Sequence, residues 1–215
     1  MSTPALKLYR FALSGHCHRA ELALSLLGLP HTLVDVDLMK GEHKAPEFLE
    51  MTPFGQVPVL DDEGMLIFDS NAILTYLATR YDKTGQWLPR DPKPLADVQG
   101  WFSVAAGTLA HGPAAARLIS LFDSNTVFGS TFDKQDVLAR SHALLKVMDA
   151  ELAKRPFLAA ARATMADVAM YSYTVSAPEG NVDLTPYGHV RAWLARVEGL
   201  AGFVPFAKTP VGLAA

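Results

Sequence analysis

Cysteine is almost absent from this chain, because Cys17 is the only one among 215 residues. A single cysteine excludes an intramolecular disulfide and any metal site built from several cysteines, and we predict that no metal is bound. The scarcity also fits a reducing compartment, since disulfides form mainly in oxidising ones. Residues 1–7 lack a basic stretch followed by an apolar one, so we expect no secretory signal and a cytoplasmic location.

An uninterrupted apolar segment of membrane-spanning length is also missing. Residues 98–116 come nearest, because they contain no Asp, Glu, Lys or Arg. However, Gly107, Gly112 and Pro113 interrupt the segment, and Gln99 adds a polar position. A membrane span needs about 20 predominantly apolar residues, so the segment favours a packed bundle helix and we expect no membrane partner.

A strongly basic region is the third absence. The chain carries 19 basic and 22 acidic side chains, a formal net charge of −3. Residues 1–82 hold 6 basic and 11 acidic side chains (net −5), and residues 83–215 hold 13 and 11 (net +2). This distribution offers no basic field for nucleic acid. An acidic first half that binds an anion must therefore do so through local donors.

Hydrophobic periodicity in the first 82 residues predicts an α/β unit. We predict strands at 5–11, 32–37, 57–60 and 65–68, and helices at 14–27 and from 69 onward. The order strand, helix, strand, irregular or short helix, hairpin, helix is that of an α/β sandwich of about eighty residues. It resembles the thioredoxin-like fold.

The pattern changes after residue 82. Residues 83–94 contain Gly85, Pro89, Pro92 and Pro94 and are typical of a linker. Beyond them strand signals nearly vanish, and helical spacing predicts helices at 96–111, 134–154, 165–175 and 190–197. We therefore assign residues 1–82 to an α/β domain, 83–94 to a linker and 95–215 to an all-helical domain.

Two short motifs in the first domain are typical of a site that binds a peptide-like anion. In the segment FGQVPVL at 54–60, Pro58 lacks an N–H and holds Val57 extended, and we expect a cis Val57–Pro58 bond. Asp69 and Ser70 stand at the start of a helix, where free N–H groups attract a carboxylate. Taken singly, the first motif is an ordinary turn and the second an ordinary helix cap.

Together these motifs resemble the glutathione-binding half of the cytosolic glutathione transferases. The likeness includes GEHKAPEFL at 41–49, TPFGQVP at 52–58 and DSNAI at 69–73, and the segment at 187–205 resembles the C-terminal part of that family. The pair Thr164 and Asp167 matches a capping box that is structural in these enzymes. The resemblance implies a thioredoxin-like domain followed by an all-helical domain, glutathione as co-substrate and a homodimer.

The segment LSGHC at 13–17, followed by Arg19, resembles the serine-type bacterial members, which are similar to the phi and theta classes. In these enzymes a hydroxyl at this position, here Ser14, stabilises the glutathione thiolate beside a helix N-terminus. The alternative role of Ser14 is that of a plain helix cap. His16 stands where many relatives have asparagine, and we expect it to face solvent.

The resemblance also implies the ligand contacts. Donors are expected at the ligand carboxylates and an acceptor at its ammonium group. The implied residues are His43 and Lys44 at the glycyl carboxylate, Gln56, Val57 and Pro58 at the cysteinyl unit, and Asp69 and Ser70 at the γ-glutamyl end. Asp69 replaces the glutamate that is commonest in the family. A small hydrophobic electrophile is expected near Leu13, Phe102, His111 and Arg117.

Three functions remain open from the sequence. The first is a transferase that joins the glutathione sulfur to an electrophile, with Ser14 as the activating group. The second is a glutathione-dependent thiol reductase or isomerase that uses Cys17, although a cysteine in the first turn of a helix is more often a packing residue. The third is a non-catalytic glutathione-binding module. Tyr9, on a strand face, is expected to be structural.

Overall fold

A four-stranded sheet forms the first part of the computed structural model, which describes residues 6–127 and 130–215. The strands are β1 (Leu6–Arg10), β2 (His31–Asp35), β3 (Val59–Asp62) and β4 (Met65–Phe68), in the spatial order β2-β1-β3-β4. Strand β2 is parallel to β1, whereas β3 is antiparallel to both β1 and β4. This mixed sheet confirms the thioredoxin-like fold.

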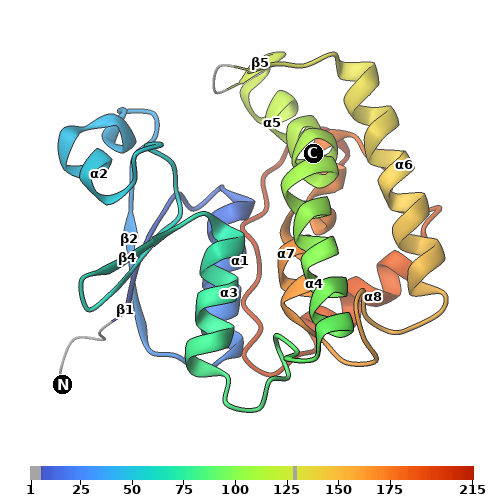
Figure 1. The fold of residues 1–215 in the computed structure, drawn as a ribbon. Coiled ribbons are helices and arrows are strands. Elements are labelled where there is room, and N and C mark those ends of the chain that lie inside the picture. The colour runs from blue at the N-terminus through green and yellow to red at the C-terminus, as the bar shows by residue number, and fades with distance from the viewer. Residues whose placement is uncertain (1–5, 128–129) are drawn as a thin grey trace.

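Helices cover both faces of this sheet. Helices α1 (Gly15–Leu26) and α3 (Ser70–Tyr81) lie between the sheet and the rest of the molecule (Figure 1). The short helix α2 (Pro46–Met51) follows a 3-10 turn, η1 (Glu42–Lys44), and packs Phe48 into a small separate core with Val36 and Val59. The larger core continues from Leu8 on β1 into the second half.

The second half of the molecule consists mainly of helices. They are α4 (Pro92–Val104), the π-helical η2 (Ala105–Ala114), α5 (Ala115–Phe122), α6 (Lys134–Leu152), α7 (Met165–Val175), the 3-10 turn η3 (Ala177–Gly180), α8 (Gly188–Glu198) and the 3-10 turn η4 (Gly212–Ala214). Two short strands, β5 (Thr126–Val127) and β6 (Ser130–Thr131), pair between α5 and α6. We did not predict this hairpin, because two-residue strands leave no period in a sequence.

The first helices of this half also differ from their predicted bounds. Helix α4 begins at Pro92, inside the segment 83–94, since proline is tolerated in the first helical turn. The helical path continues through Gly112 and Pro113 to Phe122, instead of ending at residue 111. The wider π-helical turns accommodate Pro113, which has no N–H to donate.

Among the described residues, none of the helices combines the length and hydropathy that a membrane crossing requires.

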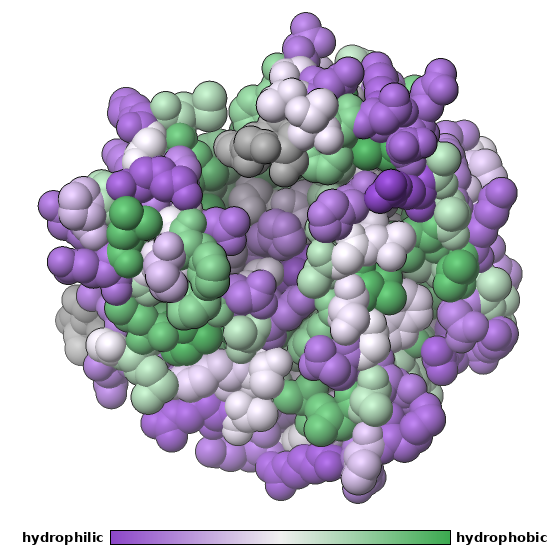
Figure 2. All heavy atoms as spheres, turned by 45° about the horizontal axis from the view of Figure 1, so that its top comes forward, coloured by the Kyte–Doolittle hydropathy of each residue, from purple (hydrophilic) through white to green (hydrophobic). Residues whose placement is uncertain are grey.

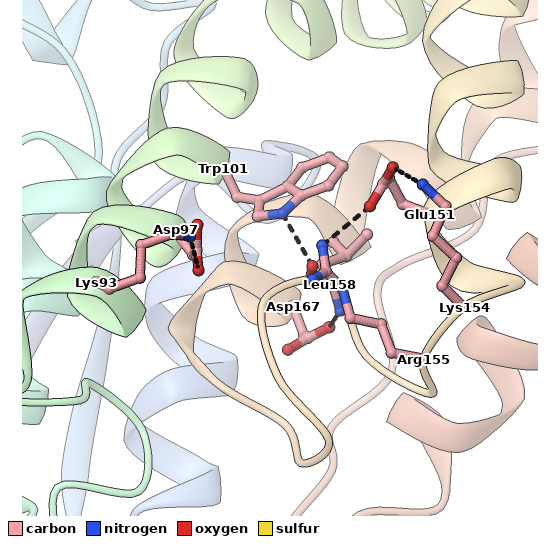
Figure 3. A network of polar contacts seen from close by, with 8 residues as sticks. All are labelled: Lys93, Asp97, Trp101, Glu151, Lys154, Arg155, Leu158 and Asp167. Atoms are coloured by element: carbon pink, nitrogen blue, oxygen red, sulfur yellow. Dashed lines mark hydrogen bonds and ion pairs between the residues drawn. The ribbon is translucent and has the colours of Figure 1, made fainter.

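A polar network holds together the loop before α7 (Figure 3). Asp167 accepts hydrogen bonds from the Thr164 and Leu158 N–H groups, each over 2.9 Å, and Trp101 donates to the Leu158 carbonyl over 3.0 Å. Because the Thr164 and Asp167 side chains bond reciprocally to the first turn of α7, the predicted capping box is confirmed. Asp167 therefore has a structural role, as part of the N-terminal cap of α7.

The C-terminal segment returns along the boundary between the two halves. Residues 199–211 pass between α1 and the helical bundle (Figure 1). Ser25 donates to the Gly202 carbonyl over 2.6 Å, His18 Nε2 lies 3.0 Å from the Val204 carbonyl, and the Arg117 guanidinium lies 4.8 Å from the ring centre of Phe206. The segment thus connects α1 with the helices of the second half.

Candidate functional site

Ser14 occupies the N-cap of α1, directly after the turn that follows β1. Its backbone is extended (φ −86°, ψ 119°), and its Oγ accepts the Cys17 N–H over 3.3 Å. The capping role that the sequence left open is therefore present. A hydroxyl that accepts a hydrogen bond keeps its own proton for a further acceptor, so capping and donation to a ligand are compatible.

Cys17 lies in the first turn of α1 and is buried, with 1% of its surface exposed. Its Sγ accepts the Phe11 N–H over 3.3 Å. Burial raises the pKa of the thiol to about 11, against the lowering effect of its hydrogen bonds with Phe11 and Ser14. A protonated, buried thiol is a poor nucleophile, and the structure favours packing as the role of Cys17.

His16 is not the solvent-facing loop histidine that we expected. It belongs to the first turn of α1, is half-buried and meets the ring of Tyr173 edge-on, with centroids 5.1 Å apart. Its Nδ1 lies 3.4 Å from Ser70 Oγ. Burial first, and then the charge of Arg19, lower the pKa of His16 to about 3, so the ring is neutral. A residue of the helical half, Tyr173, covers His16. The spacing of residues within α1 does not indicate this contact.

The loop that carries the cis Val57–Pro58 bond is attached to the turn η1. The cis bond confirms the prediction made from the sequence. Lys44 Nζ donates to the Phe54 and Gly55 carbonyls over 3.1 and 3.0 Å. Gly55 has a φ of 53°, and a Cβ on it would lie 2.6 Å from the backbone oxygen of the residue before Lys44. Only glycine permits this close approach.

The remaining predicted residues of this region differ in their exposure. Gln56 is exposed, Val57 is half-buried and Pro58 is buried. His43 is half-buried, and its Nδ1 atom is buried without a hydrogen-bond partner. Burial and then the charge of Lys44 lower the pKa of His43. The Lys44 ammonium has three donors and uses two on carbonyls, so one remains for an anion.

Asp69 and Ser70 form the second motif, at the N-terminus of α3. Asp69 has a φ of 67°, and its Oδ1 accepts the Asn71 and Ala72 N–H groups over 2.9 and 3.0 Å. It is exposed, so its second carboxylate oxygen is available to a cation. Ser70 is buried and accepts a hydrogen bond from Arg19 over 3.0 Å. A positive φ at aspartate is uncommon and fixes the carboxylate at the entrance of the helix.

Arg19 is a site residue whose role sequence reasoning did not identify. Its side chain is fully buried between α1 and α3, where Nη1 donates to Ser70 Oγ and, over 2.8 Å, to Asn71 Oδ1. The Nε and Nη2 atoms are buried without partners. Burial lowers the pKa of Arg19 to about 10, and the group stays protonated at neutral pH. The only signal was a basic residue beside Ala20 on the apolar face of α1.

Of the four residues expected at the electrophile, Phe102 is the one that lines a groove between the two halves. Phe102 is buried at a groove of about 310 Å³ between α3 and α4, which Asp69 also lines. Leu13 is half-buried and His111 is exposed on η2, and neither lines that groove. Figure 2 shows the hollow between the two halves on this side of the molecule.

The expectation for Arg117 is wrong, because the side chain is fully buried and has no surface to offer a substrate. Its Nε donates to Glu179 over 2.8 Å, and its Nη1 donates to the Leu13 carbonyl over 2.7 Å. The fold of the family alone suggested Arg117 as a residue of the electrophile site, whereas its partners lie in distant segments. The side chain instead supports the loop that holds Ser14.

The arrangement suits an extended ligand with two carboxylates and one ammonium group. Lys44 and the N-terminus of α3 supply donors, Asp69 supplies an acceptor, and Ser14 stands at the N-terminus of α1. Among residues 6–127 and 130–215, no cluster of three or more His, Cys, Asp or Glu side chains is placed to hold a metal ion. The chemistry that this arrangement supports is the stabilisation of a ligand anion by local donors.

Comparison with known proteins agrees with the fold and the motifs. The family model of the glutathione S-transferase N-terminal domain matches residues 4–79, and that of the C-terminal domain matches residues 113–201. The sequence is 33% identical over 210 residues to glutathione S-transferase 3 of Zea mays, covering 95% of this chain and 92% of the relative. It is 32% identical over 190 residues to glutathione S-transferase D7 of Anopheles gambiae, covering 88% and 84%.

Solved structures of glutathione transferases have a similar fold. The crystal structure of a glutathione S-transferase from Pseudomonas fluorescens superposes with a TM-score of 0.86 at 32% identity, covering 95% of this chain and 100% of the other. A glutathione transferase homologue from Drosophila mojavensis, solved with bound glutathione, superposes with a TM-score of 0.81 at 26% identity, covering 92% and 89%.

Proposed function

The chain belongs to the cytosolic glutathione S-transferase family, and on this premise we propose that it conjugates the glutathione thiolate to small hydrophobic electrophiles, with Ser14 as the activating residue. The observation that carries the proposal is the place of Ser14. Its hydroxyl caps α1 and keeps a proton that it can donate, and the first turn of α1 lies beside the N-terminus of α3, where His16 Nδ1 is 3.4 Å from Ser70 Oγ.

The proposed catalytic step requires only a modest stabilisation of the glutathione thiolate. A free thiol has a pKa of about 8.5, and about 1.5–3 kcal/mol from a hydrogen bond to a charged group lowers it by one to two units. The thiolate then attacks the electrophile, and its electron pair forms the new carbon–sulfur bond while a leaving group departs or a double bond takes up the charge. Ser14 remains a hydrogen-bond donor and is not consumed.

Glutathione contacts are proposed for the residues of the two motifs and of the turn η1. His43 and Lys44 bind the glycyl carboxylate, since Lys44 retains one donor. Gln56, with the Val57 and Pro58 backbone, binds the cysteinyl unit. Asp69 pairs with the γ-glutamyl ammonium, and Ser70 lies beside it on the donor side of α3. These roles agree with the charges of the ligand.

The helical domain, which we assign to residues 95–215, contributes the electrophile site. Leu13, Phe102 and His111 are the residues proposed to face it, and Arg117 is no longer among them. Clefts of this kind accept many apolar electrophiles, because a hydrophobic surface rejects few of them.

A homodimer is proposed from an exposed apolar surface on the first domain. Phe54 is 62% exposed, and its ring centre lies 5.7 Å from that of Phe68, which is also exposed. Leu66, two residues before Phe68 on β4, points to the same side of the sheet and is also exposed. Contiguous apolar patches are rare on monomers and mark interfaces. Light scattering of wild type and Phe54→Ala measures the oligomeric state directly.

The test of the proposed function is a conjugation assay on wild type and Ser14→Ala, with aromatic halides and unsaturated carbonyls as electrophiles. Calorimetry measures glutathione affinity in parallel. We expect kcat/KM to fall by about 10- to 100-fold in Ser14→Ala, because one charge-assisted hydrogen bond is lost, with affinity nearly unchanged. Equal rates would remove Ser14 from this role.

Two further outcomes separate the alternatives. The variant Cys17→Ser is expected to retain its activity, and loss of thiol reduction in this variant would support a reductase or isomerase instead. Glutathione binding with no turnover of any electrophile would support the non-catalytic module.

A further inference from the structure

Arg19 is a buried positive charge without a hydrogen-bonded carboxylate. None of its surface is exposed, and it lies on α1, which packs against α3. Its Nη1 atom donates to two neutral oxygens, Ser70 Oγ over 3.0 Å and Asn71 Oδ1 over 2.8 Å. Its Nε and Nη2 atoms are buried and have no hydrogen-bond partner among the described residues. Because a buried charge is costly unless it is paired, this arrangement points to an anion supplied by a ligand.

Arg117 shows the contrast with a buried arginine that has a permanent partner. It is equally buried, but its Nε donates to the Glu179 carboxylate over 2.8 Å. Burial is the main cause that lowers the pKa of Arg19 to about 10, and the charge of Asp69 acts in the opposite direction. The Asp69 carboxylate is nevertheless directed at helix N–H groups. Arg19 therefore stays protonated without a bonded counter-charge in the described part of the chain.

The entrance of α3, beside Arg19, uses two of its backbone donors internally. Asp69 Oδ1 accepts the Asn71 and Ala72 N–H groups over 2.9 and 3.0 Å, so these donors are occupied. An anion at this helix end therefore depends on the donors of Ser70, the first residue of the helix. Since Arg19 has no exposed surface, it acts on a ligand through Ser70, which retains 3% exposure.

The hydrogen bonds of Ser70 leave its hydroxyl proton for such an anion. Its Oγ accepts from Arg19, so the hydroxyl proton is directed to another acceptor. His16 Nδ1 lies 3.4 Å from the same oxygen, which is a weak contact, whereas a carboxylate is a strong acceptor. A hydroxyl that accepts from a cation is also a stronger donor, because hydrogen bonds in a chain polarise one another. Arg19 thus favours donation from Ser70 to an anion.

Asn71 holds the guanidinium of Arg19 in place. Its Oδ1 accepts from Arg19, and its Nδ2 donates to the Phe102 carbonyl on α4 over 3.1 Å. The guanidinium is thus tied to α3 directly and to α4 through Asn71. Donors that are fixed before a ligand arrives bind it with less loss of conformational freedom.

We propose that Arg19 is a positioning residue for the γ-glutamyl carboxylate of glutathione, which it holds through the Ser70 hydroxyl and whose charge it balances from beneath. This inference rests on the proposed function, because that function supplies the ligand. It identifies the ligand group that Arg19 recognises, so a thiol without this carboxylate gains no affinity from Arg19.

The test compares glutathione with 4-aminobutyryl-cysteinylglycine. This analogue lacks only the γ-glutamyl carboxylate and keeps the ammonium group, the thiol and the glycyl carboxylate. Calorimetry measures the affinity of both ligands for wild type, Arg19→Met, Arg19→Lys and Ser70→Ala. Arg117→Met is the matched control, because it removes an equally buried arginine whose partner is Glu179. Melting temperatures establish that each variant is folded.

The expected readout is the ratio of the two affinities. In wild type, glutathione should bind about 10- to 100-fold more tightly than the analogue, the effect of one hydrogen bond to a charged group. In Arg19→Met and Ser70→Ala this ratio should fall by about 10-fold. Arg19→Lys keeps the charge without the planar fork, so its ratio should lie between those of wild type and Arg19→Met. Arg117→Met should keep the wild-type ratio.

An unchanged ratio in Arg19→Met would overturn the inference, even if both ligands bound more weakly, since an equal loss indicates a purely structural role. If Arg19→Met does not fold, an unchanged ratio in Arg19→Lys overturns it in the same way. So would a fall of equal size in Arg117→Met, which would be a general effect of removing a buried arginine. Calorimetry needs no turnover, so these results leave the role of Ser14 untouched. If wild type binds neither ligand at millimolar concentration, the proposed function fails as well.

Discussion

Arg117 donates a 2.7 Å hydrogen bond from Nη1 to the carbonyl oxygen of Leu13, the residue directly before Ser14. The same guanidinium forms a 2.8 Å ion pair with Glu179, and both side chains are buried. Thr209, in the C-terminal segment, also donates to Glu179. The helical half therefore supports the loop that carries the proposed activating hydroxyl.

This ion pair predicts a large effect of Arg117→Met on stability. Removing one partner of a buried pair leaves an uncompensated charge, which costs about 3–5 kcal/mol of unfolding free energy. Urea unfolding measures this loss. Arg140→Met, at an exposed position of α6, is the control and should change stability by less than about 0.5 kcal/mol. Equal stability of the two variants would show that the Arg117 contacts contribute little.

Lys44 allows a test of the glycyl carboxylate contact. Calorimetry with glutathione should show several-fold weaker binding by Lys44→Met, because the remaining ammonium donor is lost. Glutathione esterified at its glycyl carboxylate should bind wild type and Lys44→Met about equally. Lys40→Met, which removes a surface pair with Asp37, should bind like wild type. A loss in Lys44→Met that persists with the ester would contradict this contact.

The close approach at Gly55 predicts a loss of both stability and binding in Gly55→Ala. The alanine Cβ would collide with the His43 backbone, in addition to the strain of a positive φ. Gly85→Ala carries the positive φ without the collision, since its nearest neighbours are 3.8 Å away. We expect thermal unfolding and calorimetry to show weaker glutathione binding only in Gly55→Ala. Equal effects in both variants would show that the backbone strain of a positive φ, without the collision at Gly55, causes the losses.

Buried His18 predicts a loss of stability in acid. Its Nε2 lies 3.0 Å from the Val204 carbonyl, which can only accept, so Nε2 carries the proton and Nδ1 accepts from Ser172 over 2.9 Å. Burial is the main cause that lowers the pKa of His18 to about 4. Between an unfolded pKa of about 6.5 and this value the unfolded chain binds a proton that the folded chain does not. Stability is therefore present above pH 6.5 and lost as the pH falls.

Urea unfolding at pH 6.5 to 4.5 measures this dependence. In His18→Gln the slope of unfolding free energy against pH should decrease by about 1.4 kcal/mol per unit, the value for one proton. His189→Gln, at an exposed position, should retain the slope of wild type. Parallel curves for wild type and His18→Gln would contradict the burial of a neutral His18.

Local sequence signals were sufficient for most of the fold. Helix α7 and strand β4 have the predicted bounds, and the cis Val57–Pro58 bond and the capping box at Thr164 were also predicted correctly. Each of these depends on residues a few positions apart. The helix through Pro113 was missed because a proline normally ends a helix, and π-helical turns relieve that constraint here.

The base of the candidate site was less predictable for a different reason. His16 and Arg19 are polar residues of α1, and their contacts with Tyr173 on α7 and Ser70 on α3 cover them. The partner of His16 is Tyr173, and that of Arg117 is Leu13, more than 100 positions away in each case. Spacing within one element does not indicate such contacts, which depend on how the two domains pack.

The most direct test is the ionisation of glutathione bound to the enzyme, followed by thiolate absorbance as the pH is raised. In wild type the midpoint should lie one to two units below the free thiol value of about 8.5, because Ser14 donates to the sulfur. In Ser14→Ala it should return close to that value. The same midpoint in both proteins would contradict the stabilisation of the thiolate by Ser14.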